Sequence, residues 1–351
     1  MEVKLTETRI VGAGHEPYII AEIGANHNGD MDLARDLIRT ARECGADAVK
    51  FQSWTPSSLV SEEEYRRNQQ YNDSPHKHFG SLREMVEKYY LREDQHFELK
   101  EYADQLGIDF CSTAFSPEEV DILVRLNVPY LKVASMDINN LPLLRIMART
   151  EKPLIVSTGM ATLAEIETAI QTIEKEGNHA IVLLHCISIY PPDYADIHLR
   201  NIGMLEQAFG YPVGFSDHSL GTSIPLAAVA LGSCLIEKHF TLSRELPGWD
   251  HEISATPDEL RTIVHEGRHI FQALGSCRRR VSPAEEEKKK AFRRSLVLSR
   301  DLPSGHILRK EDLRCKRPGT GIHPDELPYV VGRQLRTSLR RDDLLSWSSL
   351  V

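Results

Sequence analysis

Two short segments of the sequence end on a histidine beside an acidic residue. The first is Gly214-Phe215-Ser216-Asp217-His218, and the second is Glu237-Lys238-His239. Apolar residues precede each segment, so we predict two buried strands separated by the Ala- and Leu-rich helix 224–231. A strand, a helix and a strand make the two strands parallel neighbours whose C-terminal ends lie on the same side. The imidazoles would then face one mouth and could bind a divalent ion such as Mn or Zn, unless each merely caps its strand.

Lys50 and Lys132 lie inside apolar, strand-like runs, where an unpaired amine is costly. Either each lysine pairs with a buried carboxylate of its own barrel, or both hold an anion in the mouth. Nearby serine and threonine hydroxyls favour an anion such as a phosphate monoester. A phosphate compound beside a metal that polarises a carbonyl suggests carbon–carbon bond formation from an enol phosphate. Glu22 or Glu237 would move a proton. The spacing alone leaves an aldolase, an epimerase or a synthase open.

Eight apolar segments alternate with helix-like segments before about residue 275. The segments are 18–23, 48–52, 109–112, 130–134, 154–157, 180–186 and the two that lead to His218 and His239. They are apolar throughout, as expected for parallel strands covered on both faces. This predicts an α/β fold, a (β/α)8 TIM barrel over residues 1–275. An open doubly wound sheet is the alternative, although no GxGxxG motif follows the first segment.

In such a barrel the active site lies at the C-terminal ends of the strands. The polar residues predicted at those ends are Glu22, Asn26, His27, Lys50, Gln52, Ser112, Thr113, Lys132, Ser135, Ser157, Thr158, His185, Ser188, Ser216, His218, Glu237 and His239. Residues 53–92 are predicted to form a long, irregular insertion of the kind that often carries binding. The charged stretch 276–290 is predicted to be a linker or a short exposed helix, and 291–351 a small β-rich domain.

The composition bounds the class of protein. The chain has 351 residues, a formal net charge of −9 and 41% hydrophobic residues, which is ample for a large core. The mild acidity gives no support for nucleic-acid binding, and no apolar run approaches the roughly 20 residues that span a bilayer. The polar segment 1–9 lacks the apolar core of a signal peptide. Six scattered cysteines without a CxxC pair suggest reduced thiols, so we expect a cytoplasmic protein.

Seven motifs occur in the order found in one known family. They are EIGANHNG at 22–29, ADAVKFQ at 46–52, KVAS at 132–135, STGM at 157–160, FSDHS at 215–219, EKHFTL at 237–242 and KRPGTG at 316–321. Together they make the chain resemble the nonulosonic (sialic) acid synthases, in which a TIM barrel precedes an antifreeze-like (SAF) domain. The resemblance covers nearly the whole chain.

The resemblance implies a transferase reaction. Phosphoenolpyruvate (PEP) would condense with the open-chain aldehyde of an N-acyl-mannosamine-like sugar, water would attack C2, and phosphate would leave with cleavage of its C–O bond. His218 and His239 would bind the divalent metal. The expected ion is Mn²⁺, and Mg²⁺ and Co²⁺ are the alternatives. Glu22 would handle the water or a proton, and Glu237 would lie beside the metal. The PEP site would be Lys50, Thr113, Lys132, Ser135, Ser157, Ser188 and Ser216.

The resemblance also implies an acceptor site and a dimer. Gln52, Tyr190 and Asp250 would line the acceptor sugar. The family forms homodimers in which each small domain covers the partner's barrel, so Arg317 would reach an acyl group of the sugar across the dimer. The alternative for Arg317 is an ordinary solvated side chain.

The sequence departs from the usual family pattern at three places. Met136 and Asp137 stand where Gly-Glu is common, Ile187 and Ser188 stand where Thr and Asn are common, and Trp249 stands where proline or serine is frequent. The acceptor therefore stays open between N-acetylmannosamine, its 6-phosphate, a diacetamido-trideoxy hexose and a non-acetamido aldose. The EIG at 22–24 favours sialic- or legionaminic-type sugars. Two other readings are a metal-dependent aldolase or epimerase that uses no PEP, and a non-catalytic sugar-binding homologue.

Overall fold

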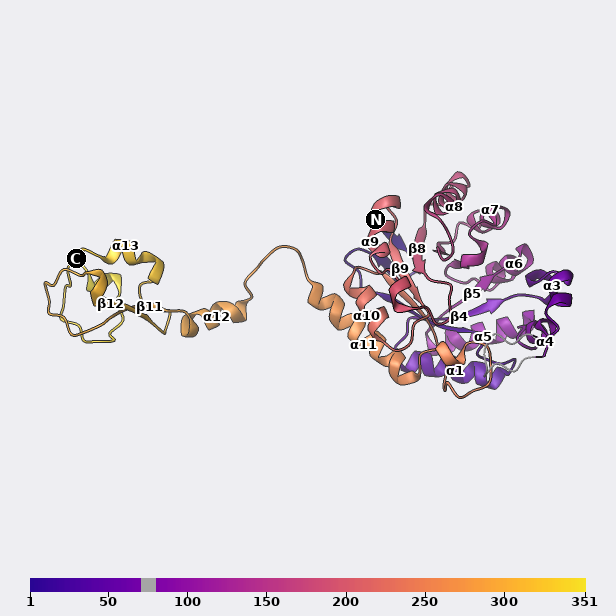
Figure 1. Cartoon of the computed structure of the whole chain (residues 1–351), viewed down its shortest axis with the longest axis horizontal. Helices are drawn as coiled ribbons and strands as arrows, with labels where there is room; N and C mark the ends of the chain where they lie inside the picture. The colour runs from indigo at the N-terminus through magenta and orange to yellow at the C-terminus, as the bar shows by residue number, and fades with distance from the viewer. Residues whose placement is uncertain (71–79) are drawn as a thin grey trace. The chain divides into compact units, whose positions relative to one another are not determined.

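The computed structural model describes residues 1–70 and 80–351, which form two compact units, Met1–Gly275 and Ser276–Val351 (Figure 1). The first unit ends at the residue where the sequence places the end of the barrel. No helix within the described ranges is both long and apolar enough to cross a membrane.

The first unit is a TIM barrel, as predicted, and not an open sheet. Within the described residues, eight parallel strands close in the order β10-β3-β4-β5-β6-β7-β8-β9. The strands are β3 (Tyr18–Gly24), β4 (Ala48–Ser53), β5 (Asp109–Ala114), β6 (Leu131–Val133), β7 (Leu154–Ser157), β8 (Ile181–Cys186), β9 (Val213–Asp217) and β10 (Leu235–His239). Their C-terminal ends therefore meet at one mouth of the barrel.

Helices surround the strands, as Figure 1 shows. Capping residues set where these helices begin: Asp30 accepts hydrogen bonds from the backbone of α1, and Ser116 caps α6 ahead of Pro117. The covering helices are α1 (Met31–Glu43), α5 (Glu93–Leu106), α6 (Pro117–Arg125), α7 (Leu141–Ala148), α8 (Leu163–Lys175), α9 (Asn201–Phe209), α10 (Ser223–Ala230) and α11 (Pro257–Leu274).

Alternate residues of each strand belong to two separate cores. Ile19, Ala21 and Ile23 of β3 pack in the layer between strands and helices, whereas Tyr18 and Ile20 belong to the barrel interior. The hairpin of β1 (Glu2–Lys4) and β2 (Ile10–Gly12) contributes Val3 and Val11 to the same interior core. Because side chains alternate along a strand, the interior set continues toward the C-terminal mouth as every second residue.

The insertion after β4 is more ordered than the sequence analysis expected. Its described part contains α2 (Pro56–Leu59), α3 (Glu62–Arg67) and α4 (Leu82–Lys88), and residues 71–79 lie outside the described ranges. Side-chain caps at Thr55, Ser61 and Ser81 start these helices. Buried aromatic residues of the insertion then pack around Trp54, so the prediction of an irregular loop was wrong for these stretches.

The second unit begins with the predicted charged stretch. Ser282 and Pro283 start α12 (Pro283–Phe292), which therefore runs two residues past the predicted end of the linker at 290. The remainder is a small domain built on the antiparallel pair β11 (Ser295–Leu298) and β12 (Leu313–Lys316), with α13 (Leu327–Val330). Leucines such as Leu296, Leu298 and Leu345 form its own core.

Candidate active site

Strand alternation decides which of the predicted residues face the barrel interior. A cavity of about 430 Å³ opens at the C-terminal ends of the strands. It is lined by fourteen of the predicted site residues: Glu22, Lys50, Gln52, Thr113, Lys132, Ser135, Ser157, Ser188, Tyr190, Ser216, His218, Glu237, His239 and Asp250. The sequence therefore identified one common site, although the residues come from segments far apart in the chain.

Other polar residues at the strand ends face away from this cavity. His185 lies on the outer face of β8, where its Nε2 is 2.6 Å from the Ile197 carbonyl oxygen. Ser112 on β5 is bonded to Ser53 at 2.6 Å. Asn26, His27 and Thr158 also lie outside the cavity lining. These residues lie at outward-facing positions of the strands or in the loops that follow them. A strand sequence that is apolar throughout does not show which positions face outward.

Two lysines and two glutamates form a buried charged cluster on the cavity floor. The Lys50 ammonium lies 2.7 Å from Glu22 Oε2 and 3.6 Å from Glu237 Oε2. Lys132 lies 3.7 Å from Glu237 Oε1 and donates to the Ser157 hydroxyl at 2.7 Å. Buried amines are tolerated because carboxylates neutralise them. The pairing alternative is therefore realised in the structure, and an incoming anion would compete with these carboxylates for the lysines.

The cluster shifts the pKa values of its members. Burial raises the pKa of Glu22 to about 7, with Lys50 opposing the shift and Glu237 adding to it. Burial also favours neutral Glu237, but Lys132 and Lys50 outweigh it and lower the pKa. Burial disfavours charged Lys50, yet the charges of Glu22 and Glu237 outweigh it and raise the pKa. Glu22 is thus the member whose charge changes near neutral pH.

Hydroxyl groups complete the polar side of the cavity. Thr113 accepts a hydrogen bond from Lys50 at 3.1 Å, and Ser216 donates to Glu237 at 2.9 Å. Ser135 and Ser188 converge on Gly159, where an added Cβ would lie 2.7 and 2.4 Å from their hydroxyl oxygens. Gly159 is therefore required for these two hydroxyls to approach one another. Such a ring of hydroxyls around ammonium groups suits a phosphate or carboxylate.

The two predicted metal ligands lie side by side. The ring centroids of His218 and His239 are 5.4 Å apart. The Nδ1 of His218 is 2.7 Å from the Ile187 carbonyl oxygen, and Tyr190 packs over the same ring at 4.0 Å. With Nδ1–H donating to that carbonyl, Nε2 carries the lone pair that a metal needs. Among the described residues, no group of three or more His, Cys, Asp or Glu side chains is arranged to hold a metal.

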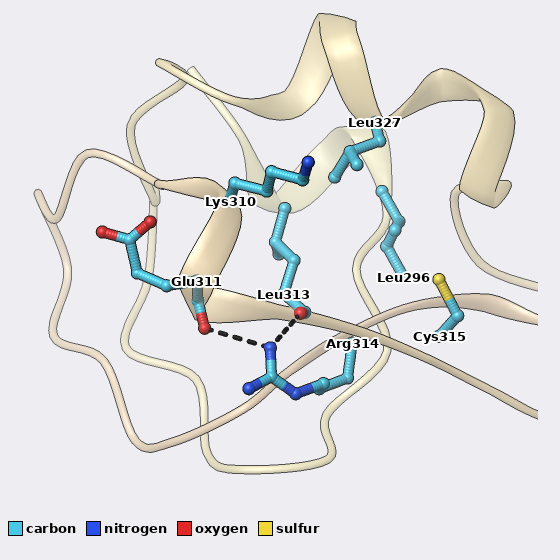
Figure 2. A pocket seen from close by; sticks show the side chains of 7 residues that line it. All are labelled: Leu296, Lys310, Glu311, Leu313, Arg314, Cys315 and Leu327. Carbon is cyan, nitrogen blue, oxygen red and sulfur yellow. Dashed lines mark hydrogen bonds between the residues drawn. The ribbon is translucent and has the colours of Figure 1, made fainter.

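Arg317 lies in the second unit, so the structure does not place it in the cavity. Its side chain is exposed, and its guanidinium lies 4.7 Å from the centre of the Phe292 ring. A separate cavity of about 400 Å³ lies within that unit, lined by Leu296, Leu313 and Leu327 (Figure 2). Arg314 beside it donates to the carbonyl oxygens of Glu311 and Leu313 at 3.3 and 2.8 Å. We assign the chemistry to the barrel cavity, which holds the buried charges.

The sequence analysis missed the apolar side of the barrel cavity. Trp54, Leu59, Phe115 and Ile253 line it, as do Met136, Met160 and Cys186. Cys186 shares the inward parity of Val182 and Leu184 on β8, but a strand that is buried on both faces shows no alternation from which this direction could be predicted. Met136 and Trp249 were singled out as departures from the family pattern, and both line the cavity. The aromatic residues gave no signal as a group, since they come from different loops.

Comparisons with known proteins agree with this architecture. The model of the NeuB family matches residues 37–279, and the model of the SAF domain matches residues 293–351. The chain is 41% identical over 343 residues to the N,N'-diacetyllegionaminic acid synthase of Legionella pneumophila. This alignment covers 97% of this chain and 96% of that protein. It is 35% identical to the human N-acetylneuraminate-9-phosphate synthase over 98% of this chain and 96% of the human one.

A solved structure is similar as well. The N-acetylneuraminic acid (sialic acid) synthetase of Leptospira borgpetersenii, in complex with citrate, matches with a TM-score of 0.74 and 34% identity, over 82% of this chain and 95% of that one. The family model covers the barrel from residue 37 onward, and the two relatives cover nearly the whole chain. This chain belongs to the NeuB family and carries a C-terminal SAF domain.

Proposed function

We propose that the protein is a nonulosonic acid synthase that condenses PEP with an N-acyl-mannosamine-like aldose and releases phosphate. The observation that carries the proposal is the pair of buried lysines, ringed by hydroxyls, in the same cavity as His218 and His239. Relatives that are named as legionaminic and neuraminic acid synthases support the class of product. The reaction is that of a transferase, and the free state of all six cysteines agrees with work in the cytoplasm.

The polar floor is suited to PEP. Lys50 and Lys132 would each exchange part of their carboxylate pairing for the phosphate and the carboxylate of the ligand. The hydroxyls of Thr113, Ser135, Ser157, Ser188 and Ser216 would donate the remaining hydrogen bonds. An added anion also favours the protonated form of Glu22, because like charges disfavour ionisation. Binding of PEP would therefore be coupled to uptake of a proton at Glu22.

The donor set fits a divalent metal. Two imidazoles of parallel neighbouring strands, one of them oriented by a backbone carbonyl at 2.7 Å, are ligands that Mn²⁺, Co²⁺ and Zn²⁺ accept. His218 and His239 would hold the ion, and substrate oxygens and water would fill its other positions. When bound, it would polarise the aldehyde oxygen of the acceptor. Asp250, whose Oδ2 lies 3.7 Å from His239 Nδ1, would orient that ring.

The charged residues of the cavity floor would then transfer the protons of the reaction. C3 of PEP would attack the aldehyde carbon, and a new carbon–carbon bond would form as the C2–C3 double bond of PEP opens and the aldehyde oxygen takes the proton held by Glu22. Glu22 would take the proton of the water that attacks C2 and would return a proton as the C–O bond to phosphate breaks. A carboxyl group with a pKa of about 7 is suited to both directions of transfer. Glu237 stays ionised and keeps both lysines in place.

The acceptor would lie on the outer side of the cavity, against Gln52, Tyr190 and Asp250. We propose a homodimer in which Arg317 of one subunit reaches the acceptor in the barrel of the other. An acceptor of the sialic or legionaminic type fits the relatives and the EIG motif.

The test is release of phosphate from PEP. The full chain with Mn²⁺ should release phosphate only when a suitable aldose is present, and PEP labelled with ¹⁸O at the bridging oxygen should deliver the label to phosphate. His218→Ala and His239→Ala should no longer retain Mn²⁺ in equilibrium dialysis, whereas His269→Ala, on the surface of α11, should retain it. A label that stays in the sugar acid, or turnover without PEP, would reject the synthase.

A further inference from the structure

The motif EIGANHNG at 22–29 contributes only Glu22 to the lining of the barrel cavity. Asn26 of the same motif lies in the turn between β3 and α1, yet its side chain is completely buried. A buried amide is costly unless hydrogen bonds replace those that it made with water. The partners of Asn26 therefore show what the turn holds in place.

Both donor bonds of the Asn26 amide lead to the segment that follows β10. Its Nδ2 donates to the Phe240 carbonyl oxygen and to the Ser254 hydroxyl, each at 2.9 Å. Phe240 directly follows His239, the last residue of β10, and the Phe240 N–H donates to the Glu22 carbonyl oxygen at 2.8 Å. Asn26 thus joins the end of β3, which carries Glu22, to the end of β10, which carries His239.

The bond from Asn26 to Ser254 continues toward the cavity. The Ser254 hydroxyl donates to the Asp250 carbonyl oxygen at 2.6 Å, and Asp250 Oδ2 lies 3.7 Å from His239 Nδ1. The two hydrogen bonds run in one direction, from Asn26 to Asp250, so each strengthens the other. Asn26 therefore fixes the backbone directly after His239 and the backbone of the residue that faces its ring.

The turn that carries Asn26 is itself held from two sides. Asn28 donates to the Pro247 carbonyl oxygen at 2.7 Å, which is a second tie to the segment after β10. Gly29 has a φ of +77°, and a Cβ there would lie 2.5 Å from the Lys88 carbonyl oxygen at the end of α4. The turn is therefore a fixed support from which Asn26 can hold the end of β10.

We propose that Asn26 is a positioning residue of the metal site. Its two amide donors hold the end of β10 and Asp250 in the arrangement that directs the His239 ring toward the ion. Removal of a group that orients a metal-binding imidazole typically weakens metal binding about 10- to 100-fold. The inference rests on the proposed function, because it takes His218 and His239 as the ligands of Mn²⁺.

Asn178 provides a matched control. It is also buried, and its Nδ2 donates to the carbonyl oxygens of Ala148 and Lys152 at 3.3 and 2.8 Å. It precedes β8, so it lies at the end of the strands opposite the mouth. Asn178→Ala and Asn26→Ala should therefore lower the melting temperature by similar amounts, while only Asn26→Ala should affect the metal site.

The experiment measures the dissociation constant of Mn²⁺ by equilibrium dialysis of the full chain and its variants. Asn26→Ala should raise this constant about 10-fold or more, and Asn178→Ala should leave it as in the parent. Ser254→Ala, which breaks only the branch to Asp250, should raise it by a smaller factor. At saturating Mn²⁺ the KM of PEP should be unchanged in Asn26→Ala, since Lys50 and Lys132 lie on β4 and β6.

The outcomes separate this inference from the proposed function. A parent chain that binds no Mn²⁺ would reject the proposed metal site, and this inference with it. If the parent binds Mn²⁺, equal dissociation constants for Asn26→Ala and Asn178→Ala would overturn this inference alone. If Asn26→Ala does not fold, Ser254→Ala decides, and a dissociation constant equal to that of the parent would overturn the inference.

Discussion

Four buried charged residues set the chemistry at the scale of single side chains. The sequence analysis opposed two roles for the lysines, pairing with carboxylates or binding an anion. In the structure Lys50 is paired with a carboxylate, since its ammonium lies 2.7 Å from Glu22. The two roles are compatible, because removal of a lysine from water requires a carboxylate until the anion arrives.

Glu22 should make the stability of the barrel depend on pH. The pKa of Glu22 in the folded barrel is about 7, above the 4.5 of an unperturbed glutamate, so the folded state binds an extra proton between these values. Stability should therefore fall as the pH rises through this window, by up to about 3 kcal/mol for this group. Urea unfolding of the parent and of Glu22→Gln at about pH 5 and pH 8 measures it. The variant should lose less stability, and equal losses would contradict the assignment.

Lys132→Met should weaken PEP binding selectively. Methionine keeps the length of the side chain but removes the charge that faces Glu237 at 3.7 Å. A charge-assisted contact of this kind contributes about 2–3 kcal/mol, so the KM of PEP should rise about 30- to 100-fold. The KM of the acceptor should change little. Lys175→Met, on the exposed end of α8, is the control, and an unchanged KM of PEP in Lys132→Met would exclude the lysine from the donor site.

At the scale of elements, β9 and β10 carry the site on one face and a buried ion pair on the other. Lys238 Nζ lies 2.7 Å from Asp217 Oδ2, and neither side chain is exposed. Lys238 also donates to the Ser219 carbonyl oxygen. Each residue of the pair directly precedes one of the two histidines. The pair therefore ties together the strand ends that position the imidazoles.

Lys238→Met should destabilise the barrel and loosen the metal site. The change leaves Asp217 buried without its partner, at a cost of about 3–5 kcal/mol. Displacement of both histidines should weaken Mn²⁺ binding about 10- to 100-fold. Thermal unfolding and titration with Mn²⁺, followed by electron paramagnetic resonance, measure the two effects. The double variant Asp217→Asn with Lys238→Met should recover much of the stability. A single variant as stable as the parent would show that the pair holds nothing in place.

At the scale of the whole molecule, all lining residues of the cavity that belong to the described part of the chain come from the barrel unit. The small domain contributes Arg317 only if it covers a barrel, and that contribution remains a prediction. The leucine core of the small domain is separate from the cores of the barrel. The small domain can therefore act as a preformed cover.

Mixed dimers distinguish a cover over the partner's barrel from one over its own. At a low concentration of the acceptor, the Arg317→Ala variant and the His239→Ala variant should each be nearly inactive alone. If the cover acts across the dimer, each mixed dimer has one intact site, and random exchange restores about a quarter of the parent activity. If the cover acts within its own chain, mixing restores nothing. Activity of the mixture, after subunits are exchanged by dilution and concentration, measures the outcome.

The sequence by itself determined the barrel, the second domain and most of the polar side chains that line the barrel cavity. Local patterns were sufficient for the fold, because apolar runs, caps and turn residues act over a few positions; the helix predicted at 224–231, for example, is found at Ser223–Ala230. Twelve of the fourteen cavity residues could be assigned to one site since parallel strands must end on one side, whereas Tyr190 and Asp250 were implied by the family resemblance.

Only the tertiary structure decided which polar residues face inward and what they touch. Strands buried on both faces show no alternation, so Cys186 and His185 could not be told apart before the barrel closed. The contact of Lys132 with Glu237 and the meeting of Trp54 with Trp249 join positions far apart in the chain. The pKa of Glu22 also depends on burial and on those neighbours. Such properties arise from distances in space, which spacing along the chain does not contain.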